Sequence, residues 1–237
     1  MLHHFPNRSS TMQSHISRLN ESFLKQCPAE ARVWWEETCV SLTRAYRRTD
    51  FDLAFARAPR VLGHSIVSVA DTHRKTESSD GIHLFDGRPL HCLARGILLM
   101  HAVAGTPAAE RDEFVFEIFV RSDNAEKESL LRTLPLLPES ARYLQTAVEA
   151  CRTNVETVFT AIACENPYPA RHFPELHFNQ MVMKTLFIGL PLARIVGLTD
   201  RITPSLKQMV RDHIAERTAA GRAVQSDTAT ILTACEG

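Results

Sequence analysis

The chain has 237 residues, of which 44% are hydrophobic and 23% are charged, a composition typical of a soluble globular protein. Lys plus Arg and Asp plus Glu each number 27, so the formal net charge is zero. This balance argues against a dedicated binder of nucleic acid or of anionic membranes, because such proteins carry a basic excess on one face.

Neither the first residues nor the cysteines indicate secretion. The segment MLHHFPNRSS lacks the apolar core of a signal peptide. The six cysteines include no CxxC pair and fall mostly in apolar patterns, which predicts free thiols in a reducing compartment. No run approaches the ~18 apolar residues of a membrane-spanning helix. We therefore expect a cytoplasmic protein with no transmembrane segment.

The pattern of hydrophobic residues predicts an all-α fold. Glycine is sparse, with nine residues, and the alternation typical of strands is rare. We expect residues 1–10 to be disordered and helices to be joined by short links, as in an irregular bundle or an α-solenoid-like stack of antiparallel helices. The expected helices span about 11–26, 28–46, 50–61, 89–103, 106–119, 123–134, 139–164, 179–189 and 205–220.

Two segments between these helices are less regular. Residues 65–69 alternate in hydrophobicity, as a short strand does, but no pairing partner is evident in the sequence. Residues 71–88 are polar and contain two Asp-Gly pairs, which predicts a long surface loop. We expect one helical domain over 11–224, with a sub-boundary at this loop, followed by a tail over 225–237 with a short helix near Asp227.

The strongest helical pattern lies in residues 139–164. Apolar residues recur there at near-heptad spacing, which predicts one continuous amphipathic helix. The residues that carry this spacing are Leu144, Val148, Cys151, Val155, Val158 and Ile162.

The loop after this helix holds several metal-ligand types. They are Cys164, Glu165, His172, Glu175 and His177. The two histidines are five positions apart with a proline between them, whereas zinc sites show short paired spacings. We therefore expect no metal and no cofactor here, and we interpret the histidines as a surface residue and a helix-start residue.

Three prolines give the same loop its character. Pro167, Pro169 and Pro174 push each preceding residue toward extended backbone, which predicts a stiff, non-helical segment anchored by Tyr168 and Phe173. Such a segment is either the wall of a preformed pocket or a rigid corner between helices.

The next predicted helix is apolar almost all round, which is typical of a buried helix. Gln180 and Lys184 lie one turn apart on one face. If Lys184 is buried, its ammonium needs an acceptor or a shifted pKa, which is one signature of a functional site. Alternatively, its long side chain reaches the surface. Asn154, early in the second half of the predicted 139–164 helix, is a weaker candidate.

No nucleophile elbow, glycine-rich phosphate loop, HExxH or kinase motif occurs in the sequence. Chemistry of those classes is therefore not indicated, and we assign no catalytic residue.

Three long motifs carry a family resemblance. They are LLRTLPLLPESARY at 130–143, RTNVETVFTAIACENPYPARHFPELHFNQMVMKTLFIGLPLARIVGL at 152–198, and MVRDHIAERTAAGRAV at 209–224. Together they resemble the EboA family over roughly residues 128–224. In the first half, only LARGILLMHA at 93–102 is similar.

The resemblance implies a protein encoded in a bacterial or algal-plastid gene cluster and described as a metabolite-traffic protein. The neighbouring genes of such clusters encode proteins similar to a prenyltransferase, a dehydroquinate-synthase-like enzyme, a TIM-barrel isomerase and a hydrolase. The cluster is linked to making a small secondary metabolite or moving its precursor toward the periplasm. The resemblance transfers no catalytic role to any position.

The leading hypothesis is a cytoplasmic, non-catalytic accessory protein that binds a small metabolite or scaffolds enzymes of its pathway. One alternative is an enzyme that acts on a pathway intermediate, with Glu165, His172 or Lys184 as acid or base. Another is a structural helical-repeat adaptor between proteins. The candidate binding residues, all within the matching motif, are Asn154, Glu165, Asn166, Tyr168, Phe173, Asn179, Gln180 and Lys184.

Overall fold

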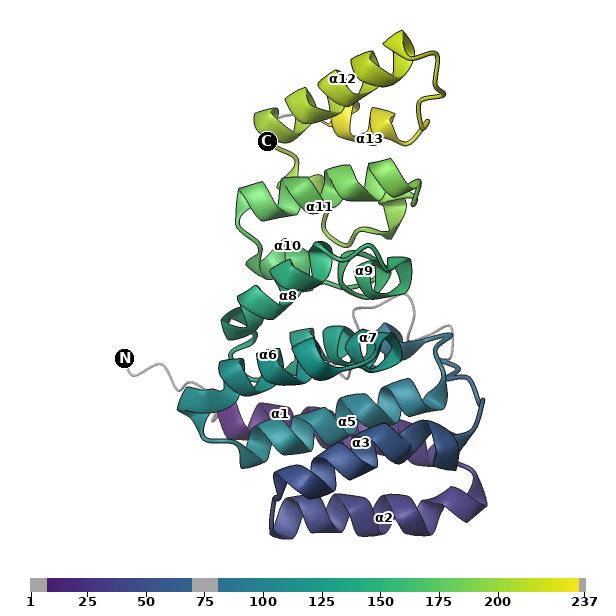
Figure 1. Ribbon diagram of the computed structural model, residues 1–237, viewed down its shortest axis with the longest axis vertical. Coiled ribbons are helices and arrows are strands. Elements are labelled where there is room, and N and C mark those ends of the chain that lie inside the picture. Colours follow the sequence, from purple (N-terminus) through teal and green to yellow (C-terminus); the bar gives the residue numbers. More distant parts are fainter. Residues whose placement is uncertain (1–7, 70–80, 235–237) are drawn as a thin grey trace, which may run out of the picture. The chain divides into compact units, whose positions relative to one another are not determined.

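The computed structural model describes residues 8–69 and 81–234 (Figure 1). This part of the chain contains 12 α-helices and no β-strand, which confirms the all-α prediction. Two compact units are present, residues 1–146 and 147–237, and each is described by itself. Whether they fold as one domain over 11–224, with a sub-boundary at 71–88, stays a prediction. Residues 1–7 and 70–80, to which most of the disorder and loop predictions refer, lie outside the described residues. The prediction of a surface loop is wrong for residues 82–85, which form a 3-10 turn with Ile82, Leu84 and Phe85 buried.

The first unit is built around one central helix, α5. This helix is buried along nearly its whole length, and α1, α3 and α7 pack against it (Figure 1). The α-helices are α1 (Arg8–Gln26), α2 (Ala29–Arg44), α3 (Arg48–Leu62), α5 (Leu90–Gly105), α6 (Arg111–Arg121) and α7 (Asn124–Thr133). Short 3-10 turns are η1 (Ile82–Phe85), η2 (Ala108–Glu110), η3 (Leu134–Leu136) and η4 (Ser140–Tyr143).

Local sequence signals set several helix ends. Asp123 caps α7, as predicted: its carboxylate accepts from the backbone N–H of Glu126 at 2.8 Å, and the Glu126 carboxylate accepts from the N–H of Asp123 at 3.1 Å. This reciprocal capping box pairs two N–H groups that a helix start leaves without partners. By contrast, α1 begins at Arg8, three residues before its predicted start.

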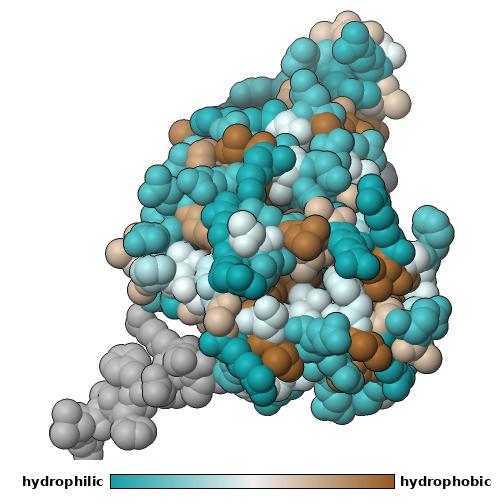
Figure 2. Space-filling model, turned by 60° about the horizontal axis from the view of Figure 1, so that its bottom comes forward, coloured by the Kyte–Doolittle hydropathy of each residue, from teal (hydrophilic) through white to brown (hydrophobic). Residues whose placement is uncertain are grey.

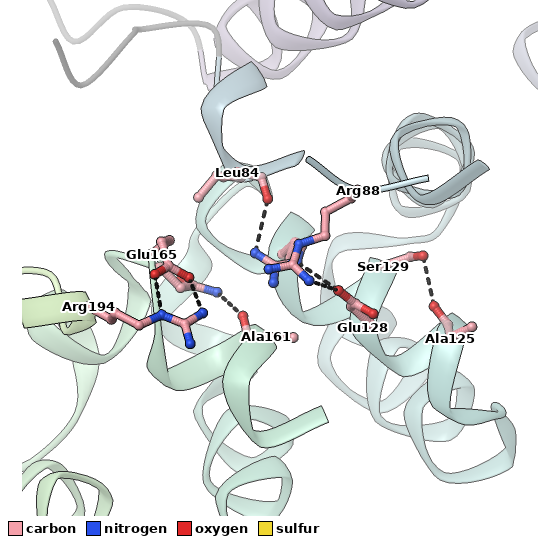
Figure 3. Close-up of polar contacts among 10 residues, drawn as sticks. Leu84, Arg88, Ala125, Glu128, Ser129, Ala161, Glu165 and Arg194 are labelled. Carbon is pink, nitrogen blue, oxygen red and sulfur yellow. Dashed lines mark hydrogen bonds and ion pairs between the residues drawn. The ribbon is translucent and has the colours of Figure 1, made fainter. Parts of the chain in front are cut away.

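Two arginines are buried in the first unit. Arg95 is 2% exposed and donates to the carbonyl of Phe55 at 2.8 Å. Arg132 is also 2% exposed and donates to the carbonyl of Leu84 at 3.1 Å. Glu128 lies 3.3 Å from the guanidinium of Arg132 and 3.2 Å from that of Arg88, and Figure 3 shows Arg88 and Glu128 pointing toward one another. The hydrogen bond from Arg132 to Leu84 connects α7 to η1.

Residues 65–69 have a partner that the sequence did not reveal. The segment forms an isolated antiparallel bridge with residues 87–90, centred on Ile66 and Pro89. The backbone of Val67 donates to the carbonyl of Arg88 at 2.7 Å and accepts from the N–H of Gly87 at 3.0 Å. The two segments are separated by the residues that the structure leaves undescribed, so their pairing is not local in sequence.

The second unit begins within α8 (Leu144–Cys151) and is a series of short helices. The others are α9 (Glu156–Ala163), α10 (Tyr168–His172), α11 (Glu175–Ile188), α12 (Pro204–Ala219) and α13 (Thr228–Thr233), with 3-10 turns η5 (Leu192–Arg194) and η6 (Thr199–Arg201). Helix α11 packs between α9 and α12 (Figure 1), which accounts for the apolar residues on its covered faces. Leu176, Phe187 and Ile188 on the same helix are exposed. Helix α13 packs on α12, so the predicted tail contains the expected short helix.

The prediction of one continuous helix over 139–164 is wrong. The chain forms η4 and α8, breaks at residues 152–155, and resumes as α9. At the break, the hydroxyl of Thr153 accepts from the backbone N–H of Val155 at 3.1 Å. Such local side-chain bonds compete with helical backbone bonds. The heptad spacing continues across the break, and for that reason the hydrophobic pattern alone did not detect it.

Across residues 8–69 and 81–234, no helix combines the length and the hydrophobicity that a bilayer crossing requires.

Candidate functional site

A cleft of about 300 Å³ opens between α8 and α11 in the second unit. Each helix contributes side chains at helical spacing, three from the last turns of α8 and the residue after it, and four from α11. The ring of Phe173, which precedes α11, completes the lining. The lining residues are Val148, Cys151, Arg152, Phe173, His177, Gln180, Met181 and Lys184.

Lys184 connects the two helices across this cleft. Its ammonium donates to the carbonyl of Cys151 at 2.7 Å and to the carbonyl of Thr153, and lies 5.0 Å from the ring centroid of Phe159. The last carbonyls of a helix lack backbone partners and carry its negative end. Lys184 therefore caps α8 at the point where the predicted 139–164 helix breaks. Its side chain is half-buried, and carbonyl oxygens supply the acceptors that its burial requires.

The segment before α11 is a helix–helix corner. The prediction that it is non-helical is wrong for residues 168–172, which form α10. Pro169 stands in the first turn of α10, where a missing N–H leaves no bond unmade and the fixed φ suits a helix. Arg201 donates to the carbonyls of Ala170 at 2.5 Å and of Phe173 at 2.7 Å. This guanidinium fixes the backbone of Phe173, and so positions the ring that lines the cleft.

Asn166 and Tyr168 stabilise this corner between α9 and α11 by buried hydrogen bonds and ring packing. The amide of Asn166 donates to the carbonyl of Ala161 at 2.9 Å, at the end of α9, and accepts from the N–H of Tyr168 at 3.0 Å, at the start of α10. The ring of Tyr168 is fully buried and meets the ring of Phe173 edge-on at a centroid distance of 6.3 Å. Both residues support the cleft wall without lining the cleft.

Glu165 pairs with Arg194 through both its side chain and its backbone. Its carboxylate accepts from the guanidinium at 2.6 and 2.9 Å, and its backbone N–H donates to the carbonyl of Arg194 at 2.8 Å. Figure 3 shows the two side chains facing each other. Glu165 has a φ of 50°, which costs a residue with a Cβ about 1–2 kcal/mol. The paired bonds to η5 offset that cost, so Glu165 stabilises the loop between α9 and α10.

The structure brings three of the eight predicted residues together in the cleft: Phe173, Gln180 and Lys184. Asn154 is exposed in the break after α8. Asn179 is 2% exposed, lies outside the cleft, and its Oδ1 has no hydrogen-bond partner among the described residues. Sequence reasoning did not select five lining residues: Val148, Cys151, Arg152, His177 and Met181. The i, i+3, i+4, i+7 spacing from His177 to Lys184 is the signal that identifies the α11 stripe.

Two neighbouring groups bear on the chemistry of the cleft. Burial raises the pKa of the Cys151 thiol to about 12, so this thiol is protonated at neutral pH and is a poor nucleophile. Burial lowers the pKa of His172. The ring of His172 packs at a tilt against that of Tyr168, with the centroids 4.7 Å apart, and is not among the lining residues. Within the described residues, no group of three or more His, Cys, Asp or Glu side chains is placed to hold a metal ion.

A smaller cleft of about 220 Å³ lies between α2 and α3 in the first unit. Two of its polar side chains, Ser41 and Asp50, are bonded to each other. The carboxylate of Asp50 accepts from Arg47 at 3.0 Å and from the hydroxyl of Ser41 at 3.3 Å. The α8–α11 cleft is larger, and it lies within the motif that carries the family resemblance.

Comparison with known proteins gives a family assignment. Neither the curated proteins nor the solved structures include a match to this chain. The family described as metabolite traffic protein EboA matches residues 15–232, which extends well beyond the three motifs in the second half. The chain therefore belongs to the EboA family.

Proposed function

We propose that this chain is a cytoplasmic, non-catalytic accessory protein of a secondary-metabolite pathway, and that it binds a small molecule in the α8–α11 cleft. The observation that carries the proposal is the pair of facing side-chain stripes on α8 and α11, which enclose about 300 Å³. That volume is at the lower end of the ~300–1,000 Å³ of small-molecule sites. Membership of a family described by metabolite traffic is consistent with such a site.

The positions of the acid and base candidates favour binding over catalysis. Glu165 is paired with Arg194 outside the cleft, and His172 packs on Tyr168. Of these three candidates, only Lys184 lines the cleft, together with His177, and the Lys184 ammonium already donates to two carbonyls. Acid–base catalysis requires a group within reach of the reacting atoms and free to exchange a proton. The three candidates do not converge in this way, and enzymes of the same pathway are therefore proposed as partners that supply the chemistry.

The adaptor alternative depends on a large apolar surface. Large exposed hydrophobic side chains in α2 and α3 include Val33, Val40 and Leu53. On the face drawn in Figure 2, brown side chains are separated by teal ones and form no continuous patch. Scattered exposed hydrophobic residues are normal on soluble proteins. This face therefore offers an adaptor no extended docking site.

Native mass spectrometry of the protein purified from its own host tests the proposal. We expect the wild-type protein to retain a bound small molecule, seen as a discrete mass increment that collisional activation removes. Gln180→Trp is expected to lose the increment, because an indole at this exposed position fills the cleft without entering the core. Arg211→Gln, an exposed change on α12 outside the cleft, is the matched control. A wild-type protein without an increment, or an increment kept by Gln180→Trp, contradicts the proposal.

A further inference from the structure

The charges that line the α8–α11 cleft have one sign. Arg152 and Lys184 are basic, and none of the eight lining residues is Asp or Glu. The carboxylate of Glu149 lies 2.9 Å from the guanidinium of Arg152, but Glu149 is outside the lining. Both members of that ion pair are exposed, with side-chain exposures of 68% for Arg152 and 44% for Glu149. An exposed pair of this kind is weak and is easily exchanged for another partner.

Lys184 adds to this positive charge. An ammonium has three N–H donors, and the carbonyls of Cys151 and Thr153 take two of them. No carboxylate of residues 8–69 or 81–234 forms an ion pair with Lys184 among the described salt bridges. The C-terminus of a helix carries about half a negative charge, which is less than the full charge of the ammonium. The end of α8 therefore does not cancel the positive charge of Lys184.

Apolar side chains also line the cleft, alongside Cys151, His177 and Gln180. Val148, Met181 and Phe173 supply aliphatic, thioether and aromatic surfaces. Such surfaces gain free energy by covering an apolar ligand of similar shape. The basic groups and the apolar groups lie within one cleft of about 300 Å³, so one small molecule can contact both.

We infer that the ligand of this cleft is a small amphiphile that carries an oxyanion, such as a carboxylate or phosphate, on an apolar body. The oxyanion lies toward Arg152 and the third N–H of Lys184, and the apolar body lies against Phe173, Val148 and Met181. Such a site excludes cationic molecules and binds neutral apolar molecules less tightly. This inference rests on the proposed function, because it names the ligand class of the same cleft.

Two fluorescent probes that differ chiefly by one charge test the inference. 1-Anilinonaphthalene-8-sulfonate is anionic, and N-phenyl-1-naphthylamine has the same ring system without the sulfonate. We expect the wild-type protein to bind the sulfonate about tenfold more tightly, the effect of one good charge-assisted hydrogen bond. Arg152→Gln removes most of this preference, whereas Glu149→Gln increases it, because Glu149 competes for the guanidinium. Neither change alters binding of the neutral probe.

Three further measurements distinguish a failure of the charge assignment from a failure of the binding site. Gln180→Trp is expected to abolish binding of both probes, and Arg211→Gln to change neither. Inorganic phosphate at matched ionic strength is expected not to displace the sulfonate probe, because phosphate lacks the apolar body. Displacement by phosphate would overturn the amphiphile assignment. If Gln180→Trp blocks both probes but Arg152→Gln leaves their ratio unchanged, the charge assignment is wrong while the cleft remains a binding site. If Gln180→Trp blocks neither, the inference fails, and the mass increment still decides the proposed function separately.

Discussion

Replacement of Lys184 by Met is expected to destabilise the second unit by about 2–3 kcal/mol. The change leaves the carbonyls of Cys151 and Thr153 without their donor, and hydrogen bonds to a charged group contribute about 1.5–3 kcal/mol. It also removes a cation from the negative end of α8. Urea denaturation followed by circular dichroism gives the change in free energy of unfolding. Hydrogen exchange of amides in α8 and α9 shows where the loss occurs.

Lys127 provides a matched control for this change. Its ammonium lies 5.3 Å from the ring centroid of Phe119, close to the 5.0 Å between Lys184 and Phe159. The described contacts of the Lys127 ammonium include this ring but no carbonyl. Lys127→Met therefore removes a similar cation–π contact alone and is expected to cost less than about 1 kcal/mol. Equal losses for the two variants would show that the carbonyl bonds of Lys184 contribute nothing.

Replacement of Tyr168 by Ala is expected to cost about 3–5 kcal/mol, the usual loss for a large buried aromatic side chain. The ring is 0% exposed and packs on His172 and Phe173. Without it, Phe173 loses a neighbour and the cleft wall becomes mobile, so binding of the anionic probe weakens as well. Denaturant titration measures the first effect, and probe fluorescence at low denaturant measures the second.

Tyr168→Phe tests whether the loss in Tyr168→Ala comes from the missing ring or from any substitution at this position. This variant keeps the ring, its edge-on contact with Phe173 and most of the buried area, so we expect it to retain most of the stability and the probe affinity. Comparable losses for Tyr168→Phe and Tyr168→Ala would contradict the view that ring packing holds the corner.

The sequence predicted helices correctly where the hydrophobic periodicity and the capping residues agreed. Asp123 predicted the start of α7, and the structure confirms it. The all-round apolar pattern predicted a buried α11, which holds for most of its apolar residues, whereas Leu176, Phe187 and Ile188 are exposed. The break between α8 and α9 could not be predicted from the hydrophobic pattern, because the heptad spacing continues across it. One of the groups that bonds the backbone at the break, Lys184, lies more than thirty positions later in the chain. The prolines predicted extended backbone and no helix in this segment. Proline is tolerated in the first turn of a helix, which is where Pro169 stands in α10.

The sequence predicted the part of the candidate site that depends on local helical periodicity. Gln180 and Lys184 share one face of a single helix, so their proximity follows from local periodicity. Arg152 and Cys151 reach the cleft only because the chain breaks after α8 and α11 returns alongside it. The sequence pattern placed them in the interior of a longer helix. Asn166 and Glu165 were candidates because they lie in the matching motif. In the structure Asn166 bonds the backbone of Ala161, and Glu165 pairs with the guanidinium of Arg194.

Methionine-methyl NMR tests most directly the claim that the α8–α11 cleft holds a small molecule. The chain has six methionines, and Met181 lines the cleft. Met183 lies two positions later on the same helix and is outside the lining, and Met100 is fully buried in the first unit. On addition of a small-molecule extract of the host, we predict that the Met181 methyl signal shifts while those of Met183 and Met100 stay in place. An unshifted Met181 signal in a protein whose mass shows a bound molecule would contradict the account.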